Sequence, residues 1–96
     1  MAKNRRQPRL IEGPLASRPL YTPKQGQYLA FIHSYQKVHR RPPAESDLQE
    51  YFRVSAPSVH DMILRLEEQG LISRVRGEAR SIRILLPPEL LQELES

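Results

Sequence analysis

The apolar residues between positions 48 and 66 repeat at helical spacing on both sides of a short gap. Those on one face of each half are Leu48, Tyr51 and Phe52, then Val59, Met62, Ile63 and Leu66. The gap, residues 53–55, has room for little more than a turn. Two short amphipathic helices joined by such a turn are typical of a helix-turn-helix.

The second of these helices carries a signal at each end. Ser55 can cap its first free backbone N–H groups, and Pro57 suits its first turn. Gly70 stands where a left-handed residue commonly ends a helix. The sequence therefore predicts a helix over about 56–69.

The face of this helix that lies opposite the apolar stripe is polar. A short helix with such a face can enter a DNA major groove, which is about 12 Å wide. The alternative is an ordinary solvated surface, because most polar helix faces meet only water. The candidate DNA contacts at the start of the helix and along this face are Ser55, Ala56, Ser58, His60, Asp61 and Arg65.

A longer helix is predicted upstream of this pair. Thr22 followed by Pro23 marks its start, as a cap residue before a proline at the first helical position. A broad apolar stripe follows, made of Tyr28, Leu29, Phe31, Ile32 and Tyr35. We expect the helix over 23–38, with its aromatic rings in the core rather than in a base-stacking surface.

The linker 39–43 ends this helix, because its two prolines remove backbone donors and force the preceding residue into an extended conformation. Two starts are open for the helix that follows. Ser46 and Gln49 could form a capping box, or Ala44 could be the cap position with Asp47 in the first turn.

The periodicity changes to two after Gly70. Apolar and polar residues alternate over 71–76, and a second such run over 81–85 follows a turn at 77–79, which predicts a β-hairpin. A basic hairpin directly after a helix-turn-helix is a wing, whose arginines could contact phosphate or the minor groove. The alternative is that they only protect an exposed edge strand. The arginines are Arg74, Arg76, Arg80 and Arg83, against Glu78 alone.

Both ends of the chain differ from the predicted domain over 21–86. Residues 1–20 are polar and contain several prolines, so we expect a flexible arm that either binds phosphate or acts as a solubilising tail. Residues 87–96 predict a short helix that either packs on its own domain or pairs with a second copy. Weaker candidates for phosphate contacts, in the arm and elsewhere, are Arg5, Arg6, Thr22, Lys24, Arg40, Arg41 and Arg53.

Composition narrows the function further. Ninety-six residues, 39% of them hydrophobic, make one domain with a small core and leave no room for a second, catalytic domain. The absence of cysteine excludes disulfides and thiolate zinc sites and fits a reducing cytoplasm. No apolar run approaches a membrane span, and the net charge of +4 indicates a polyanionic partner. The three histidines have no spacing typical of a metal or general-base site, so we expect no cofactor, metal or enzymatic activity.

Over residues 21–86 the chain resembles the amino-terminal winged-helix domain of the LexA repressor family. The segments that carry the resemblance are Thr22-Pro23-Lys24-Gln25, Pro42-Pro43, Gly70-Leu71-Ile72 and the wing over 75–85. The family's carboxy-terminal peptidase domain has no counterpart, so self-cleavage is not implied. Arg53 occupies the turn position where such motifs usually have glycine, and residues 54–61 look closer to winged-helix regulators of the MarR and metal-regulator kinds.

The pattern and the resemblance lead to one expectation of fold and function. The fold is expected to be α+β, a winged helix-turn-helix of three helices and a hairpin. We expect a sequence-specific double-stranded DNA binder, a transcriptional regulator of repressor type that acts as a homodimer, and we identify no small-molecule effector. The alternative is a winged helix used as a protein-interaction or assembly module, because fold does not fix function.

Overall fold

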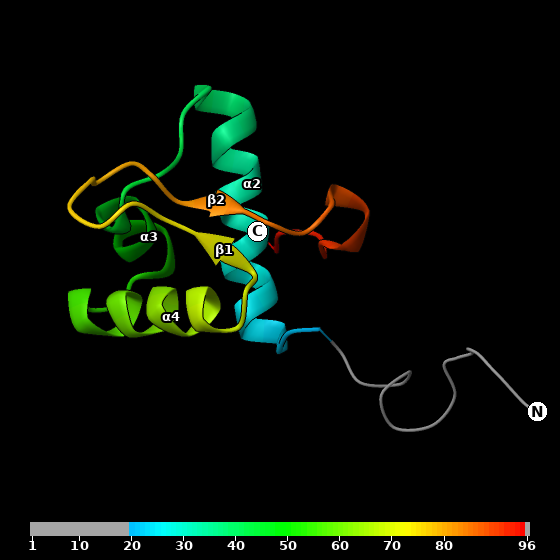
Figure 1. The fold of residues 1–96 in the computed structure, drawn as a ribbon, viewed down its shortest axis with the longest axis horizontal. Helices are drawn as coiled ribbons and strands as arrows, with labels where there is room; N and C mark the ends of the chain where they lie inside the picture. Colours follow the sequence, from blue (N-terminus) through cyan, green and yellow to red (C-terminus); the bar gives the residue numbers. More distant parts are fainter. Residues whose placement is uncertain (1–19, 96) are drawn as a thin grey trace, which may run out of the picture.

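The computed structural model describes residues 20–95, which form three helices, a two-stranded hairpin and one turn of 3-10 helix. The elements in chain order are α2 (Pro23–His39), α3 (Glu45–Phe52), α4 (Ala56–Glu68), β1 (Ile72–Ser73), β2 (Arg83–Ile84) and η1 (Pro88–Leu90). Figure 1 shows α4 crossing the N-terminal end of α2, with the hairpin beside both. The predicted three helices and hairpin, a winged helix-turn-helix, are confirmed.

Helix α2 begins with a complete capping box. The Gln25 backbone N–H donates to Thr22 Oγ1 over 3.1 Å, and the Gln25 side-chain oxygen accepts from the Thr22 N–H over 2.9 Å. The buried Gln25 amide also donates to Gln69 Oε1 over 2.7 Å, which joins the start of α2 to the end of α4. The helix ends at His39, one residue beyond the expected end, and Arg40 closes it in the left-handed region at φ 61°.

Helix α3 starts in the second of the two expected ways. Ala44 is the cap position, and its backbone N–H donates to Asp47 Oδ2 over 2.8 Å. The alternative box of Ser46 and Gln49 is wrong, because Ser46 already lies inside the first turn. At the other end Arg53 adopts φ 57°, so the turn keeps its left-handed position although glycine is absent.

Helix α4 has the predicted signals at both ends. Ser55 Oγ accepts from the Ser58 N–H, and Pro57 lies in the first turn. The helix ends at Glu68, one residue before the expected end, and Gly70 follows at φ 77°. Its inward face meets α2 and α3 in a continuous core that has no solvent exposure at Leu29, Leu48, Val59, Ile63 and Leu66.

The hairpin is shorter than the alternation predicted. Only Ile72 pairs with Ile84 and Ser73 with Arg83, in antiparallel register. Beyond this ladder, residues 74–82 form a loop whose turn has Gly77 at φ 85°. Ser81 closes that loop, because its Oγ accepts from the Val75 N–H over 2.8 Å and its hydroxyl can donate to the carbonyl of Val75 or Glu78.

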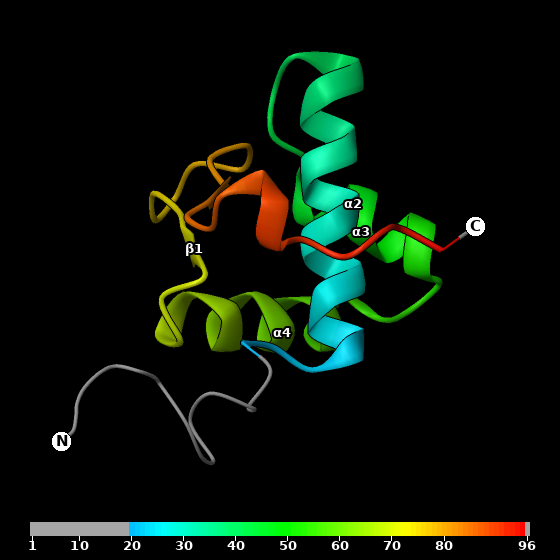
Figure 2. The same ribbon diagram turned by 90° about the vertical axis from the view of Figure 1, so that its right-hand side faces the viewer.

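The expected C-terminal helix is limited to the single turn of η1. Residues 91–95 then cross α2 toward α3 without helix or strand structure, as Figure 2 shows. Gln27 holds this segment from both sides: its Nε2 donates to the Glu93 carbonyl, and its Oε1 accepts from the Glu95 N–H. The tail thus packs on its own domain, as one of the two expected options has it, and pairing with a second copy stays a prediction.

Gly26 explains how the tail comes so close to α2. A Cβ at this position would lie 2.0 Å from Gln92 Oε1 and 2.7 Å from the Tyr21 ring. Glycine costs helix stability of about 0.5–1 kcal/mol relative to alanine. Its use inside α2 is therefore accounted for by the close approach of Gln92 and Tyr21.

Two further expectations concern the basic arm and membrane-spanning helices. The predicted basic arm, with Arg5 and Arg6, lies outside the described residues apart from its last position. Within residues 20–95, no helix is long and apolar enough to cross a membrane.

Candidate nucleic-acid interface

The outward face of α4 carries every candidate residue that the sequence placed on it. Val59, Ile63 and Leu66 are buried, and the candidates are exposed: Ser55, Ala56, Ser58, His60, Asp61 and Arg65. With about 100° between successive residues, Asp61 and Leu64 lie near the middle of this face. His60 lies on one flank, and Ser58 and Arg65 lie on the other.

Ser55 and Ser58 are linked at the start of α4. Ser55 Oγ accepts from the Ser58 N–H over 3.3 Å, and its hydroxyl donates to Ser58 Oγ over 3.0 Å. Ser55 is therefore occupied as the helix cap. The Ser58 hydroxyl keeps its own hydrogen available to an outside acceptor.

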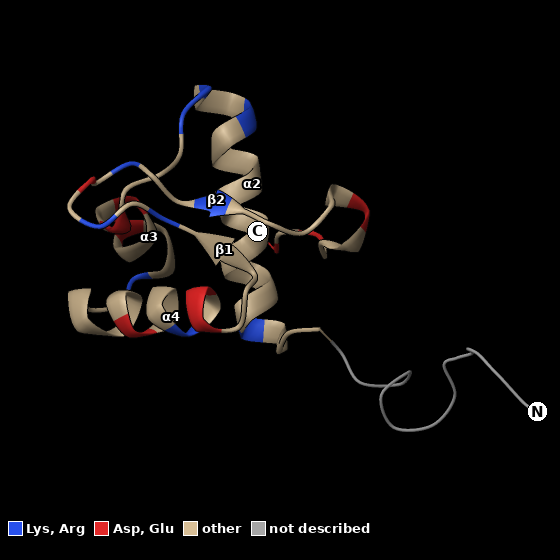
Figure 3. Cartoon of the chain, viewed as in Figure 1, with Lys and Arg blue, Asp and Glu red and all other residues tan. Residues whose placement is uncertain are grey.

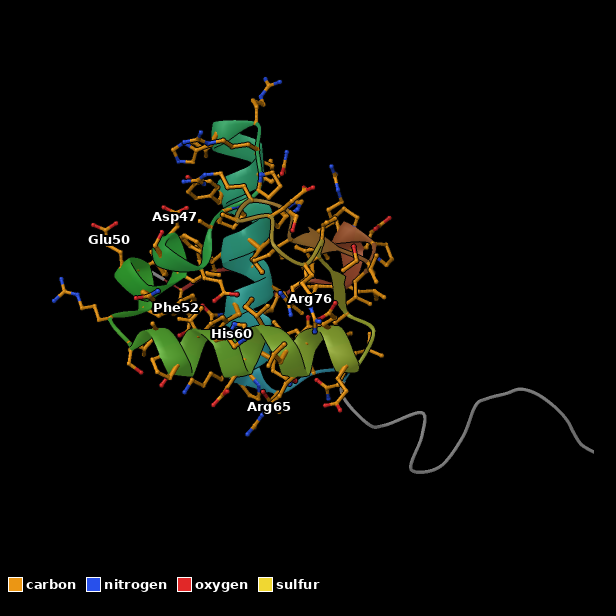
Figure 4. All side chains as sticks on the ribbon, turned by 60° about the vertical axis from the view of Figure 1, so that its left-hand side comes forward. Asp47, Glu50, Phe52, His60, Arg65 and Arg76 are labelled. Atoms are coloured by element: carbon orange, nitrogen blue, oxygen red, sulfur yellow. The ribbon has the colours of Figure 1, made fainter. Side chains whose placement is uncertain are left out.

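His60 lies on the flank of α4 that faces the wing. Its Nδ1 is 3.2 Å from Glu45 Oε2 at the start of α3, and half of its side chain remains exposed. Figure 4 shows His60 and Arg76 on the same side of α4, and Arg65 on the opposite edge. One reading surface can therefore include His60 together with the wing, with Arg65 at its border.

Leu64 is the residue on this face that the sequence pattern missed. It is 39% exposed, although a leucine at helical spacing is usually assigned to the core. Its place between His60 and Asp61 on the outward face, at 100° per residue, was the available signal. An exposed aliphatic group there can contact a thymine methyl group in the major groove.

The four wing arginines fall into two classes. Arg76 and Arg83 are exposed, and within residues 20–95 neither has a hydrogen bond or ion pair through its side chain. Arg74 is mostly buried and its Nε donates to Glu67 Oε1 over 3.0 Å, at the end of α4. Arg80 also turns inward, toward α2 and α3.

Arg80 reaches three acceptors through one nitrogen. Its Nη1 lies 2.9 Å from Asp47 Oδ2, 3.1 Å from the Tyr35 hydroxyl and 3.2 Å from the Pro42 carbonyl. Its guanidinium carbon also lies 5.9 Å from the centre of the Tyr35 ring. The hydrogen bond to Tyr35 and the contact with Asp47 raise the pKa of Arg80 despite partial desolvation.

Charge is unevenly divided between the helix pair and the wing. Residues 45–69 carry more acid than base, while the wing is basic, as the red and blue segments of Figure 3 show. Two ion pairs among the described residues neutralise part of that acid, Glu67 with Arg74 and Asp47 with Arg80, and Glu45 lies within hydrogen-bond distance of His60. The wing is thus attached to the helix pair by opposite charge.

Residues 21–77 match a family described as the iron dependent repressor, N-terminal DNA binding domain. The chain belongs to this family. The matched span covers α2, α3, α4, β1 and the first half of the wing loop. The protein is therefore a DNA-binding transcriptional regulator, and its partner is double-stranded DNA.

The iron-dependent repressor match corrects part of the sequence interpretation. The winged-helix DNA-binding class inferred from the LexA resemblance is confirmed, but the matching family is not LexA. The segment over 54–61, which looked closer to winged-helix regulators of the MarR and metal-regulator kinds, falls inside the matched span.

The family's name raises the question of an iron site in this domain. The chain has no cysteine, and within residues 20–95 no three His, Asp or Glu side chains gather as a metal ion would require. The described residues therefore do not fit an iron site.

The remaining candidates in this iron-dependent repressor domain are spread over its surface. Thr22 Oγ1 is used as the cap of α2, and Lys24 is exposed in the first turn of that helix. Arg53 is exposed at the turn between α3 and α4. Arg40 and Arg41 are exposed at the end of α2 away from α4, as Figure 1 shows.

Proposed function

We propose that this domain is a sequence-specific repressor of transcription that places α4 in the major groove of double-stranded DNA. The observation that carries the proposal is the common orientation of His60 on α4 and Arg76 on the wing, on one side of the molecule (Figure 4). Such a surface can meet base edges and the neighbouring backbone together. No enzymatic role is proposed.

Base reading is assigned to the outward face of α4. The Ser58 hydroxyl can donate to an acceptor on a base edge, and His60 can exchange hydrogen bonds with a base once it leaves Glu45. Leu64 adds an apolar surface for a thymine methyl group. Asp61 lies between them and can accept only from a donor such as the cytosine amino group.

Backbone binding is assigned to the wing, because the helix pair is itself acidic. DNA phosphates repel residues 45–69 as a whole. The affinity for the DNA backbone must therefore come from basic side chains elsewhere on the same side of the molecule. Arg76 is exposed and has no partner within residues 20–95, so its charge is available to a phosphate or a narrow minor groove. Arg83, on β2, is a second such group.

Two copies are proposed to bind an inverted repeat. A single α4 and wing cover only a few base pairs, which is less than a regulator needs to find its site in a genome. The half-sites are expected about 34 Å apart, or a multiple of this spacing, on one side of the duplex. The stoichiometry on selected duplexes measures this directly, and one copy on an unrepeated site would contradict it.

The experiment that tests the function is selection of binding sites from random duplexes by the purified chain. We expect a single recurrent motif, and an affinity that falls steeply as salt rises because bound phosphates release counterions. Failure to recover any motif at low salt would favour the alternative, a winged helix used for protein assembly. A protein interface need not show the steep salt dependence.

Two sets of variants then separate contacts with base edges from contacts with phosphates. Ser58→Ala and His60→Ala should each cost about 1–3 kcal/mol on the selected duplex and much less on a scrambled one. Arg76→Met should weaken binding to both duplexes by a similar factor. It should also reduce the magnitude of the salt slope of binding by about one. Arg76→Lys is the matched control, since it keeps the charge.

A further inference from the structure

The Arg80 side chain joins three parts of the molecule that are distant in the sequence. It comes from the wing and meets Tyr35 near the end of α2, Pro42 in the following linker and Asp47 in the first turn of α3. Asp47 Oδ2 also accepts the Ala44 N–H, so one carboxylate both caps α3 and holds Arg80. The wing is thereby fastened to the elements that position the helix-turn-helix.

The hydrogen-bonding capacity of Arg80 Nη1 is already used inside the molecule. This nitrogen has two hydrogens, and three acceptors lie within 3.2 Å of it. A phosphate could reach the same nitrogen only by displacing Asp47, Tyr35 or Pro42. Arg76 faces no such competition within residues 20–95.

The wing loop is stiff enough to transmit this attachment. The neighbouring residue, Ser81, is buried and closes the loop against Val75 and Glu78. A loop that is closed at one residue and fastened at the next has little freedom relative to α3. The position of Arg76 in space therefore depends on Arg80.

We propose that Arg80 is a positioning residue that fixes the wing against α2 and α3, so that Arg76 lies where the DNA backbone passes α4. This inference rests on the proposed function. It departs from the expectation that Arg80 itself grips phosphate. It predicts that any change which opens the contact among Arg80, Asp47 and Tyr35 weakens DNA binding through the wing.

The test compares variants of both sides of the contact on the selected duplex, at temperatures where each variant is folded. Asp47→Asn removes the charge that holds Arg80, and Tyr35→Phe removes one acceptor without changing any charge. We expect Asp47→Asn to weaken binding by on the order of tenfold and Tyr35→Phe by about threefold. Arg80→Lys should bind weakly despite its retained charge, because its ammonium group ends one bond short of the position of Nη1 and cannot reach Asp47, Tyr35 and Pro42 together.

The opposite outcome is equally specific. If Arg80 grips a phosphate, Asp47→Asn removes a competing negative charge and should strengthen binding, Tyr35→Phe should have no effect, and Arg80→Lys should bind almost normally. Any of these results would overturn the positioning role while leaving the proposed function intact.

A measurement without DNA tests the attachment of the wing loop directly. Amide exchange of Val75 and Glu78 in the free protein should be faster in Arg80→Met and Tyr35→Phe than in the wild type, because the loop loses its attachment. Unchanged exchange in both variants would contradict the inference. A wild-type protein that selects no DNA motif would instead contradict the proposed function, whatever the exchange shows.

Discussion

The helix pair of α3 and α4 and the wing are held in place by different kinds of contact. The helix pair is held by local caps and by core residues spaced along the inner face of each helix. Leu48 in α3 and Ile63 in α4 are examples, and both are fully buried. The wing has a ladder of only two residue pairs and is fastened by side chains that reach across the molecule.

Charge follows the same division. The helix pair is acidic and the wing is basic, and two ion pairs, Glu67 with Arg74 and Asp47 with Arg80, join them. The helix pair is thus poor in positive charge, and the wing is basic but depends on the helices for its position. Stability and DNA binding should therefore respond differently when each region is changed.

The largest expected effect comes from the core that both regions share. Ile63→Ala should lower the free energy of unfolding by about 2–5 kcal/mol, because it leaves a cavity where α4 meets α2 and α3. Its neighbour Leu64 on the outward face is the control, and Leu64→Ala should change the stability by no more than about 0.5 kcal/mol. Denaturant unfolding measures both. Equal losses would mean that the two faces of α4 are wrongly assigned.

A smaller effect is expected at the local cap of α4. Ser55→Ala should cost about 1 kcal/mol of stability, since the Ser58 N–H loses its acceptor. Ser46→Ala is the matched control, because Ser46 lies inside the first turn of α3 and caps nothing. That change should be neutral or stabilising by a few tenths of a kcal/mol, in line with helix propensity. A clear loss of stability in Ser46→Ala would instead indicate that Ser46 caps α3, as in the alternative capping box with Gln49.

The sequence predicted the limits of α2 and α4 to within one residue because their signals are local. The residues that start and stop α2 and α4 lie within a few positions of the groups they bind, as Thr22 and Gln25 or Ser55 and Ser58 do. Helical periodicity also placed the candidates on the outward face of α4. These signals do not depend on tertiary structure.

The sequence could not predict the attachment of the wing. Arg74, Arg76, Arg80 and Arg83 look alike in the chain, and only the fold brings Arg80 to a carboxylate 33 positions away. The tail shows the same limit, because its expected helix is replaced by an extended segment held by Gln27 on α2. Long-range hydrogen bonds override local propensity in both places.

Acid should act on the wing attachment before it acts on the core. Partial burial alone would raise the pKa of Asp47, but the hydrogen bonds from the Ala44 N–H and Arg80, with the charge of Arg80, bring it below its ordinary value of 3.8. A carboxylate with a lowered pKa adds stability that is complete above its unfolded pKa, and this stability is lost as pH falls through the folded value. We expect the wild type to lose its advantage over Asp47→Asn below about pH 4.

The effect should be modest, because both partners are partly exposed and water screens them. Glu50→Gln, on the exposed side of the same helix, is the control and should leave the acid dependence of unfolding unchanged. A constant difference between wild type and Asp47→Asn from pH 7 to pH 2 would show that the carboxylate charge contributes nothing to the attachment.

The smallest expected change lies at the turn that joins the two helices. Arg53 at φ 57° carries the cost of a left-handed backbone, roughly 1–2 kcal/mol for a residue with a Cβ. Glycine removes that strain but loses about 0.4–1 kcal/mol through the greater freedom of the unfolded chain. Arg53→Gly should therefore raise the free energy of unfolding by only about 0.5 kcal/mol. Arg53→Ala keeps the strain and removes the charge, so it should not stabilise. If both variants gain equally, the relief comes from removing the arginine side chain rather than from the backbone, and the turn is not strained.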